Sequence, residues 1–430
     1  VEMGGCQVGG RKIEGFWLKV GESLGKVTVP KLVMTPQTIL NLRNVSRAAA
    51  PHRYPILLQG PTSAGKTSLV EWMAASTGHR FVRINNHAHT DVQEYLGGFV
   101  TDEEGRLAFQ EGPLVKALRN GDWLVLDELN LAPSEVLEML NRLLDDNREL
   151  FIADTQEIVK PHPGFMLFAT QNPAGGAYGG RKVMSRAFRN RFLEVHIDQI
   201  PEAELKMMVE QRCLLAPSRA ERIVQVMQQL HRRRQRSNVF AGGQAFVTAR
   251  DLFKLAERFK AGADDSYTLL ASETVMLLSE GLRRPEEKTV VVEVVEQIMK
   301  VKVDVATLYA TGWDVDVGIM LNGAAPEVTS DKAFEGLVLT RGTKRMLRLV
   351  ARCMRFEEPC LLVGETGTGK TSVCQALASS LGRALHILNC HQNTETADLI
   401  GGYRPVRGKE GAVRTARAAI LEYLLLLPAA

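Results

Sequence analysis

Residues 60–67 read Gly60-Pro61-Thr62-Ser63-Ala64-Gly65-Lys66-Thr67 and directly follow the apolar run Ile56-Leu57-Leu58. This order predicts a buried strand, a glycine-rich loop and then a helix from about Lys66 to Ser76. The glycines let the loop curl until several N–H groups face one anion, Lys66 can reach the β and γ phosphates, and the Thr67 hydroxyl can ligate magnesium. The helix adds the positive end of its dipole. The stretch predicts a nucleotide-phosphate site, against the alternative of a turn that matches by chance.

The same pattern recurs later in the chain. Residues 364–371 read Gly364-Glu365-Thr366-Gly367-Thr368-Gly369-Lys370-Thr371, again after an apolar run, Leu361-Leu362-Val363. At an offset of 304 residues the two regions align without a gap, pairing Pro55 with Pro359 and Gly78 with Gly382. Two matches in the same context argue against chance, and they predict an internal repeat of a whole domain.

Length and composition indicate a soluble protein of more than one domain. The chain has 430 residues, of which 45% are hydrophobic and 24% charged, a normal balance for globular proteins. A net charge of +4 is small for this size. The overall charge of the chain therefore does not favour binding to nucleic acid or to an anionic membrane. The basic cluster at 232–236 carries no interleaved aromatic residues. It therefore favours a solvated helix end over a nucleic-acid patch.

The six cysteines show no pairing or metal-ligand pattern. They are scattered at positions 6, 213, 353, 360, 374 and 390, which indicates reduced, mostly buried thiols of an intracellular protein. Cys390 and His391 are adjacent, but no second such pair occurs, so a zinc site is not expected. No apolar run reaches about 18 residues and no signal peptide is evident. The chain starts at Val1 without an initiator methionine, and we expect a fragment.

Two further strands deliver polar residues at their carboxyl ends. Trp123-Leu124-Val125-Leu126 runs into Asp127 and Glu128, and the strand from Phe165 to Thr170 runs into Gln171 and Asn172. Open parallel sheets keep their sites at this edge. Asp127 is expected to hold the magnesium shell, usually through water, and Glu128 to polarise the attacking water. Asn172 is expected to sense the γ phosphate or orient water. The alternatives are an exposed acidic strand end and a turn asparagine before proline.

Arginines supply the remaining candidate site residues. Segment 181–193 places four arginines beside apolar anchors, and a rigidly held guanidinium can stabilise charge on a transferring phosphoryl group, often from a neighbouring unit. Only one or two can act in this way, and the others are expected in structural ion pairs. Arg250 opens a predicted helix and could reach bound phosphate. The equal alternative is a capping-turn arginine paired with Asp251.

The periodicity divides the chain into six parts. Residues 1–34 are interpreted as a connector or the tail of a preceding unit, 35–200 as an α/β core, and 201–310 as a helical lid. Residues 311–338, rich in glycine, are interpreted as a linker, 339–411 as a partial second core, and 412–430 as an atypical tail. After about residue 411 no strand ending in Asp-Glu follows, so the second copy has a phosphate loop without its catalytic carboxylates.

Two hairpins are predicted inside the α/β core. One covers residues 96–110 around the charged tip Asp102-Glu103-Glu104-Gly105, and the other covers residues 149–159. The first hairpin suits contact with a substrate or a neighbour, with a purely structural role as the alternative.

These features together resemble the modules of AAA+ ATPases: a phosphate loop, a strand ending in Asp-Glu, a strand ending in Asn, an arginine cluster and a helical lid. Several longer strings are similar to the midasin family of dynein-related AAA+ proteins, and the likeness covers roughly residues 10 to 411. The strings include Leu126-Asp127-Glu128-Leu129-Asn130-Leu131-Ala132-Pro133, Phe168-Ala169-Thr170-Gln171-Asn172-Pro173, Ser185-Arg186-Ala187-Phe188-Arg189-Asn190-Arg191-Phe192 and Asn389-Cys390-His391.

The resemblance implies a fold and a set of residue roles. The fold is an α/β P-loop NTPase (AAA+) fold, a doubly wound parallel sheet with an all-α lid, followed by a truncated second copy. The cofactors are ATP and Mg²⁺, with Thr67, Asp127 and Thr371 as metal ligands. Glu128 and Asn172 are catalytic, Arg191 is the first candidate for the arginine finger and Arg189 the second, and Arg250 falls at sensor 2. The nucleotide-binding residues are Gly60, Pro61, Thr62, Ser63, Ala64, Gly65, Lys66, Thr67 and Ser68, and Gly364, Glu365, Thr366, Gly367, Thr368, Gly369, Lys370, Thr371 and Ser372.

The family also implies partners and a location. Six such modules in one chain form a ring, and ATP hydrolysis removes assembly factors from pre-60S ribosomal particles in the nucleolus and nucleoplasm. No membrane and no sequence-specific nucleic acid is expected as a partner. This chain departs from the family pattern because it holds one full module and part of another, and a fragment or an incomplete gene model would explain the difference.

Three other functions remain open on the same fold, because fold does not fix function. One is a nucleotide switch whose bound ATP only rigidifies a ring, and Glu128 argues against it for the first module. A MoxR-type chaperone is disfavoured by tandem fused modules. A nucleic-acid motor is disfavoured by the near-neutral charge and would show a steep salt dependence of binding.

Overall fold

The computed structural model describes residues 10–101, 107–173, 183–236, 247–262, 265–282, 284–310, 313–320, 337–391, 394 and 399. The hairpin tip at 102–105 and the tail at 412–430 lie outside these residues, as does the second copy beyond 399.

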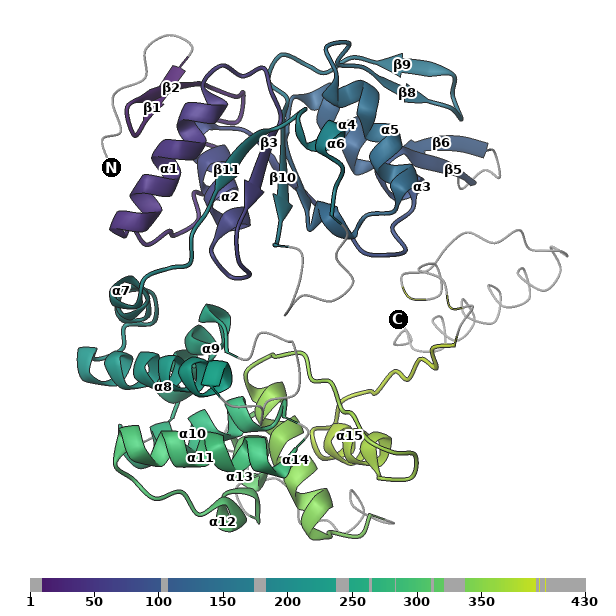
Figure 1. The fold of residues 1–430 in the computed structure, drawn as a ribbon. Coiled ribbons are helices and arrows are strands. Elements are labelled where there is room, and N and C mark those ends of the chain that lie inside the picture. Colours follow the sequence, from purple (N-terminus) through teal and green to yellow (C-terminus); the bar gives the residue numbers. More distant parts are fainter. Residues whose placement is uncertain are drawn as a thin grey trace, which may run out of the picture. The chain divides into compact units, whose positions relative to one another are not determined.

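A five-stranded parallel sheet forms the centre of the first module (Figure 1). Its strands are β3 (Ile56–Gln59), β4 (Phe81–Asn85), β7 (Trp123–Asp127), β10 (Met166–Gln171) and β11 (Leu193–His196). Their order is β11-β3-β10-β7-β4, and each neighbouring pair is parallel. The connections that leave the neighbouring strands β3 and β10 therefore run in opposite directions across the sheet, toward β4 and β11. The phosphate loop that follows β3 lies at this switch point, where doubly wound sheets bind ligands.

The three central strands, β3, β10 and β7, are nearly all apolar because both faces of the sheet are covered there. Residues Ile56, Leu58, Val125 and Phe168 share one buried cluster with α1 (Pro36–Ala49) and α2 (Lys66–Thr77). The alternate residues of the central strands are buried too, since all five residues of β7 are buried, and α4 (Pro113–Asn120) contacts β4 and β7. Helices α3 (Val92–Leu96), α5 (Ser134–Leu144) and α6 (Arg186–Arg189) and the 3-10 turn at Leu129–Leu131 complete the core.

Three hairpins are attached to this core. The predicted pair is confirmed as β5 (Gly97–Thr101) with β6 (Leu107–Glu111) and β8 (Leu150–Ile152) with β9 (Glu157–Val159). The third, β1 (Gly10–Ile13) with β2 (Phe16–Lys19), falls in the segment interpreted as a connector. Ile13 and Leu18 are buried in the cluster that includes α1 and α2. The described part of residues 1–34 is thus packed onto the core, because its alternating apolar residues cover the helices.

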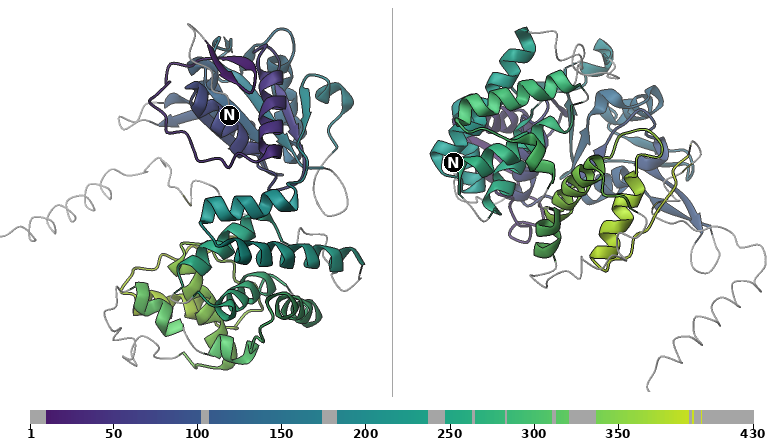
Figure 2. Two further views of the ribbon diagram at one scale, coloured as in Figure 1. Left: turned by 90° about the vertical axis from the view of Figure 1, so that its left-hand side faces the viewer. Right: turned by 90° about the horizontal axis from the view of Figure 1, so that it is seen from below.

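The lid consists of α7 (Glu202–Cys213), α8 (Pro217–Arg236), α9 (Ala249–Lys260), α10 (Tyr267–Ser279), α11 (Pro285–Met299) and α12 (Val305–Ala310). The first five lie within three residues of the helices that the apolar periodicity predicts at 201–213, 218–235, 248–260, 266–282 and 286–301, and Figure 2 shows them in teal and green. Their inward faces form one apolar cluster that includes Val209, Leu230, Leu255 and Val294. None of the helices described is long and apolar enough for a bilayer crossing.

The region interpreted as a linker contains a helix. Residues 313–320 form α13, and its Val317 shares a small core with Leu347 of α14 (Arg341–Arg355) and Leu377 of α15 (Lys370–Ser380). Among the described residues 356–391 no strand forms, although Leu361-Leu362-Val363 predicts one. Leu361 is 87% exposed and Val363 is 74% exposed, so no described strand lies against this run to pair with it.

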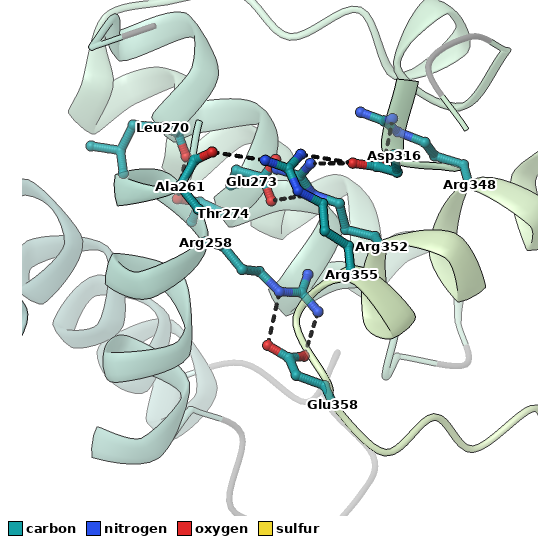
Figure 3. Close-up of polar contacts among 10 residues, drawn as sticks. All are labelled: Arg258, Ala261, Leu270, Glu273, Thr274, Asp316, Arg348, Arg352, Arg355 and Glu358. Carbon is teal, nitrogen blue, oxygen red and sulfur yellow. Dashed lines mark hydrogen bonds and ion pairs between the residues drawn. The ribbon is translucent and has the colours of Figure 1, made fainter. Parts of the chain in front are cut away.

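Buried ion pairs connect the lid to α13 and α14 (Figure 3). Asp316 of α13 is fully buried and accepts hydrogen bonds from Arg348 (2.8 Å), Arg352 (2.8 Å) and Arg355 (2.9 Å) of α14. Arg352 also pairs with Glu273 of α10. Arg258 of α9 pairs with Glu358, which follows α14. Each of these buried charges thus has an opposite charge in contact, which offsets the cost of removing it from water.

Candidate functional site

The phosphate loop connects β3 to α2 with an unusual backbone. Gly65 has φ +81° and Ser63 has φ +59°, and α2 starts at Lys66 directly after this turn. Turns of this kind form concave sites in which successive backbone N–H groups can bind an anion. Gly60 is needed for a different reason, since a Cβ there would lie 2.1 Å from the carbonyl oxygen of Ile197. The glycine pattern therefore reflects close packing against β11 at one end and a left-handed turn at the other.

The side chain of Lys66 contacts the beginning of the phosphate loop. It is 8% exposed, and its Nζ donates to the carbonyl oxygens of Gly60 (2.7 Å) and Pro61 (2.8 Å) and to Oδ1 of Asn172 (2.8 Å). Asn172 in turn donates from Nδ2 to Oε1 of Glu128 (3.1 Å). A continuous chain of hydrogen bonds thus joins the loop lysine to the carboxylate expected to act as general base.

Asp127 lies at the end of β7 and its carboxylate has three contacts. Oδ2 accepts from Thr67 Oγ1 at 3.3 Å and from the guanidinium of Arg83, and Oδ1 accepts from Thr170 Oγ1. Asn86 fixes the backbone at this point by donating from Nδ2 to the Asp127 carbonyl oxygen at 2.9 Å. The acidic strand end is therefore held inside a polar network, which argues against its alternative interpretation as an exposed acidic tip.

Glu128 has a left-handed backbone, with φ +52° and ψ +43°. Residues other than glycine, asparagine and aspartate adopt this region rarely, and such positions concentrate at functional sites. The backbone N–H of Glu128 donates to Thr170 Oγ1 at 3.0 Å. Thr170 therefore contacts both acidic residues and fixes their orientation.

The donor set fits magnesium bound together with a triphosphate. Mg²⁺ prefers oxygen ligands and in nucleotide sites takes one or two protein groups plus phosphate oxygens. The Thr67 hydroxyl and the Asp127 carboxylate, already in contact, are such a pair. Among the described residues no cluster of three or more histidine, cysteine, aspartate or glutamate side chains could hold a metal alone. The site thus suits a metal that arrives with its nucleotide.

A cavity of about 790 Å³ surrounds these groups. Its floor includes Thr67, Asp127, Glu128 and Asn172, and its wall includes Arg250 at the start of α9. Asp251 serves the helix cap, accepting from the Thr248 N–H and hydroxyl, each at 2.8 Å. Of the two predictions for Arg250, the structure places this residue at the cavity, while the Asp251 carboxylate accepts from Thr248. The remaining lining is mixed, and its apolar members include Leu32, Val33, Ile200, Met208 and Phe253.

Arg189 and Arg191 lie away from this cavity. Both precede β11, at the amino edge of the sheet, whereas the phosphate loop lies at the carboxyl edge. Arg189 pairs with Glu194, which lowers the pKa of that carboxyl. Arg191 pairs with Asp145 at 2.5 Å, beside a second cavity of about 430 Å³. Neither arginine is placed to complete the site of its own module, so their predicted finger role requires a neighbouring module.

The second loop repeats the local geometry of the first. Gly367 and Gly369 have φ +80° and +81°, and α15 begins at Lys370 as α2 begins at Lys66. Lys370 Nζ donates to the carbonyl oxygens of Gly364 (2.9 Å) and Glu365 (2.6 Å). The local sequence therefore forms the same phosphate-loop backbone even where no described strand flanks it. Thr371 follows at the position that Thr67 occupies in the first loop.

Sequence reasoning missed Arg83 and Thr170. The sequence patterns give these two residues no role at the site, yet their side chains contact Asp127. For Arg83 a signal was present, since a charged residue interrupts the strand Phe81-Val82-Arg83-Ile84-Asn85 near its carboxyl end. Thr170 gave less indication, because threonine is common in strands.

Two family models match the chain. The AAA domain of the dynein-related subfamily matches residues 55–192 and 359–422. The Midasin AAA lid domain matches residues 204–302. The first model matches both copies of the repeat, and the second covers the helices from α7 to α11.

The relatives agree with the family models. A Midasin of Dictyostelium discoideum is 52% identical over 417 residues, which cover 96% of this chain and 7% of that protein. A Midasin of Giardia intestinalis is 39% identical over 392 residues, which cover 88% of this chain and 8% of that protein. The chain thus spans less than a tenth of the length of these two relatives.

Among solved structures, NtrX of Brucella abortus in complex with ADP aligns over 82% of this chain and 70% of its own, with 16% identity and a TM-score of 0.40. The assignment rests on the family models and the relatives. The parallel sheet with its phosphate loop, the midasin-type lid and the agreement over nearly the whole chain show that it belongs to the midasin family of dynein-related AAA+ proteins.

Proposed function

We propose that the first module hydrolyses ATP with magnesium. The observation that carries this proposal is the hydrogen-bonded chain Lys66–Asn172–Glu128, beside the Thr67–Asp127 pair. Residues at separations of 60 and 106 along the chain meet here, and each is of the type that phosphoryl transfer to water requires.

The proposed roles follow from the geometry. Lys66 and the loop N–H groups bind the β and γ phosphates, and the Lys66 charge offsets the charge of the transferring group. Glu128 accepts a proton from the attacking water, and Asn172 orients both that water and the γ phosphate. Thr67 and Asp127 would hold magnesium, which would supply a positive charge to the phosphate oxygens. Arg250 contributes a cation from the lid.

We further propose that Arg191, with Arg189 as the alternative, acts on the site of an adjacent module. Its position at the amino edge of the sheet supports this. For the second copy only nucleotide binding through Lys370 and Thr371 is proposed. Its described residues, 337–391, contribute a phosphate loop with the geometry of the first loop.

At the level of the whole protein, the family supports a role in large ribosomal subunit maturation. In this proposal the modules join a ring with other AAA+ modules, and ATP hydrolysis removes assembly factors from pre-60S particles in the nucleus. Sedimentation of the tagged full-length protein with nuclear pre-60S particles would test this role. A protein found only in cytoplasmic fractions, away from ribosomal precursors, would contradict it.

Hydrolysis is tested by the Glu128→Gln variant. Glutamine keeps the size of the side chain but cannot take a proton, so ATP should bind normally and persist longer than in wild type. Retention of radiolabelled ATP measures this directly. Equal retention in both proteins would contradict the role of Glu128, and absence of ATP binding by wild type with magnesium would refute the function itself.

A further inference from the structure

Arg83 forms an ion pair with the aspartate expected to hold magnesium. It lies on β4, two residues before Asn85, which is the register partner of Asp127 on β7. Its Nη2 donates to Asp127 Oδ2, the same oxygen that accepts from Thr67. The guanidinium therefore binds the oxygen that faces the expected metal position.

Two cations compete for this one carboxylate. A guanidinium and a magnesium ion both require a carboxylate oxygen with its negative charge, and two positive charges a few ångströms apart repel each other strongly in a partly buried site. The remaining oxygen, Oδ1, is already used by Thr170. Magnesium bound by Thr67 and Asp127 and the Arg83–Asp127 pair thus oppose each other.

The exposure of the Arg83 and Asp127 side chains indicates which of them moves when magnesium binds. The Asp127 side chain is 11% exposed, whereas the Arg83 side chain is 43% exposed and lines the nucleotide cavity. Arginine can leave the carboxylate and remain hydrated or meet the triphosphate, at little cost in desolvation. Asp127 is fixed by its strand and by Thr170, so it stays in place.

The second copy offers a natural contrast. At the offset that pairs the two phosphate loops, Arg83 corresponds to Ile387. The arginine is therefore not part of the sequence pattern that the two copies share. Among residues 381–391 the structure describes no strand, so the contrast concerns the sequence alone.

We propose that Arg83 is a positioning residue that competes with magnesium for Asp127 and so raises the magnesium concentration at which the first module binds ATP. This inference rests on the proposed function, because it assumes a site for magnesium and ATP. Magnesium-ATP binding displaces the guanidinium from Oδ2, and the freed cation lies within the same cavity as the phosphates.

The test measures the magnesium dependence of nucleotide binding in the purified chain. A fluorescent N-methylanthraniloyl-ATP is held at fixed concentration while magnesium chloride is titrated at constant ionic strength. Arg83→Ile and Arg83→Gln remove the charge, and each should lower the half-maximal magnesium concentration by about threefold or more. Arg83→Lys keeps the charge and should stay within about twofold of wild type. Arg80→Ile, at an exposed arginine outside the cavity lining, is the matched control and should leave the titration unchanged.

Each outcome distinguishes this inference from the proposed function. If wild type binds the analogue but neither Arg83→Ile nor Arg83→Gln shifts the titration downward, the competition is refuted. An upward shift would also refute it, because Arg83 would then support the metal site. If wild type binds no analogue at any magnesium concentration, the proposed function fails instead. Thermal unfolding in EDTA verifies folding of each variant, and the glutamine variant decides the question if the isoleucine variant does not fold.

Discussion

At the scale of single residues, Asn172 has the most informative position. Its amide contacts both Lys66 and Glu128, so it connects the phosphate loop to the proposed general base. Asn172→Ala should lower ATP turnover by at least about tenfold, since a preorganised donor at a reacting centre typically contributes that much or more. ATP affinity should change far less, because Lys66 retains its loop contacts.

Steady-state turnover and equilibrium binding measure the two effects separately. The matched control is Asn44→Ala on α1, which is outside the cavity lining. Equal losses in binding and turnover would show that Asn172 acts on ground-state binding and not on the chemical step.

His79 gives the protein a pH-dependent stability. It is 3% exposed and stacks on Trp123 with ring centroids 4.9 Å apart. Burial, with a smaller contribution from His52, lowers the pKa of His79 from 6.5 to about 4. The unfolded chain therefore binds a proton more readily between these values, and stability is fully present above pH 6.5 and falls as the pH drops toward 4.

The expected loss from His79 is at most about 3 kcal/mol across that window. Urea unfolding from pH 7 to pH 4 measures it. His79→Phe should flatten the slope of unfolding free energy against pH, whereas His89→Gln, at an exposed histidine, should not. A slope unchanged in His79→Phe would contradict the assignment.

At the scale of elements, the end of α2 depends on Gly78. Its φ is +76°, and a Cβ there would lie 2.5 Å from backbone atoms of Leu24. The N–H of Gly78 caps the helix and its carbonyl oxygen accepts from Ser23 N at 3.0 Å. The glycine thus closes the helix and brings it against the segment that follows β2.

Gly78→Ala should destabilise the first module by about 2 kcal/mol or more, because strain and a steric clash combine. Chemical denaturation measures the change. Gly281→Ala is the control, since a Cβ there meets nothing within 4 Å and the φ is not positive. Similar losses at both positions would mean that the packing against Leu24 contributes little.

At the scale of the whole molecule, the buried ion pairs of α14 connect the lid to the beginning of the second copy. Asp316→Asn would leave three arginines facing a neutral amide. Removing one partner of a buried charge cluster typically costs about 3–5 kcal/mol. We expect a loss of that order, together with faster hydrogen exchange in α14.

The matched control is Glu296→Gln. It removes an ion pair with Lys302, whose side chain is 92% exposed, and exposed pairs contribute at most about 1 kcal/mol. Hydrogen exchange with mass spectrometry reports on α14 directly. Unchanged protection of α14 in Asp316→Asn would show that the apolar contacts of α13 suffice.

Local sequence patterns were sufficient to predict those site residues that belong to a single loop or to the end of a single strand. The glycine spacing and Lys66 specified the phosphate loop, and both copies show the same left-handed turns. Apolar strands ending in Asp127 and Asn172 specified the carboxyl edge of a parallel sheet, where the structure brings those side chains together. The lid helices followed from their 3.6-residue period. These features depend on near neighbours in the chain, so a single sequence contains them.

Only the tertiary structure decided which distant residues share a contact. Arg83 and Thr170 meet Asp127 across neighbouring strands, from 44 and 43 residues away. Asp316 meets three arginines of α14 inside a stretch whose glycines predicted a linker, and β1 and β2 pack on the core where a connector was expected. The physical reason is the same in each case: burial and charge pairing are decided by strand order and helix packing, which the periodicity of one segment does not encode.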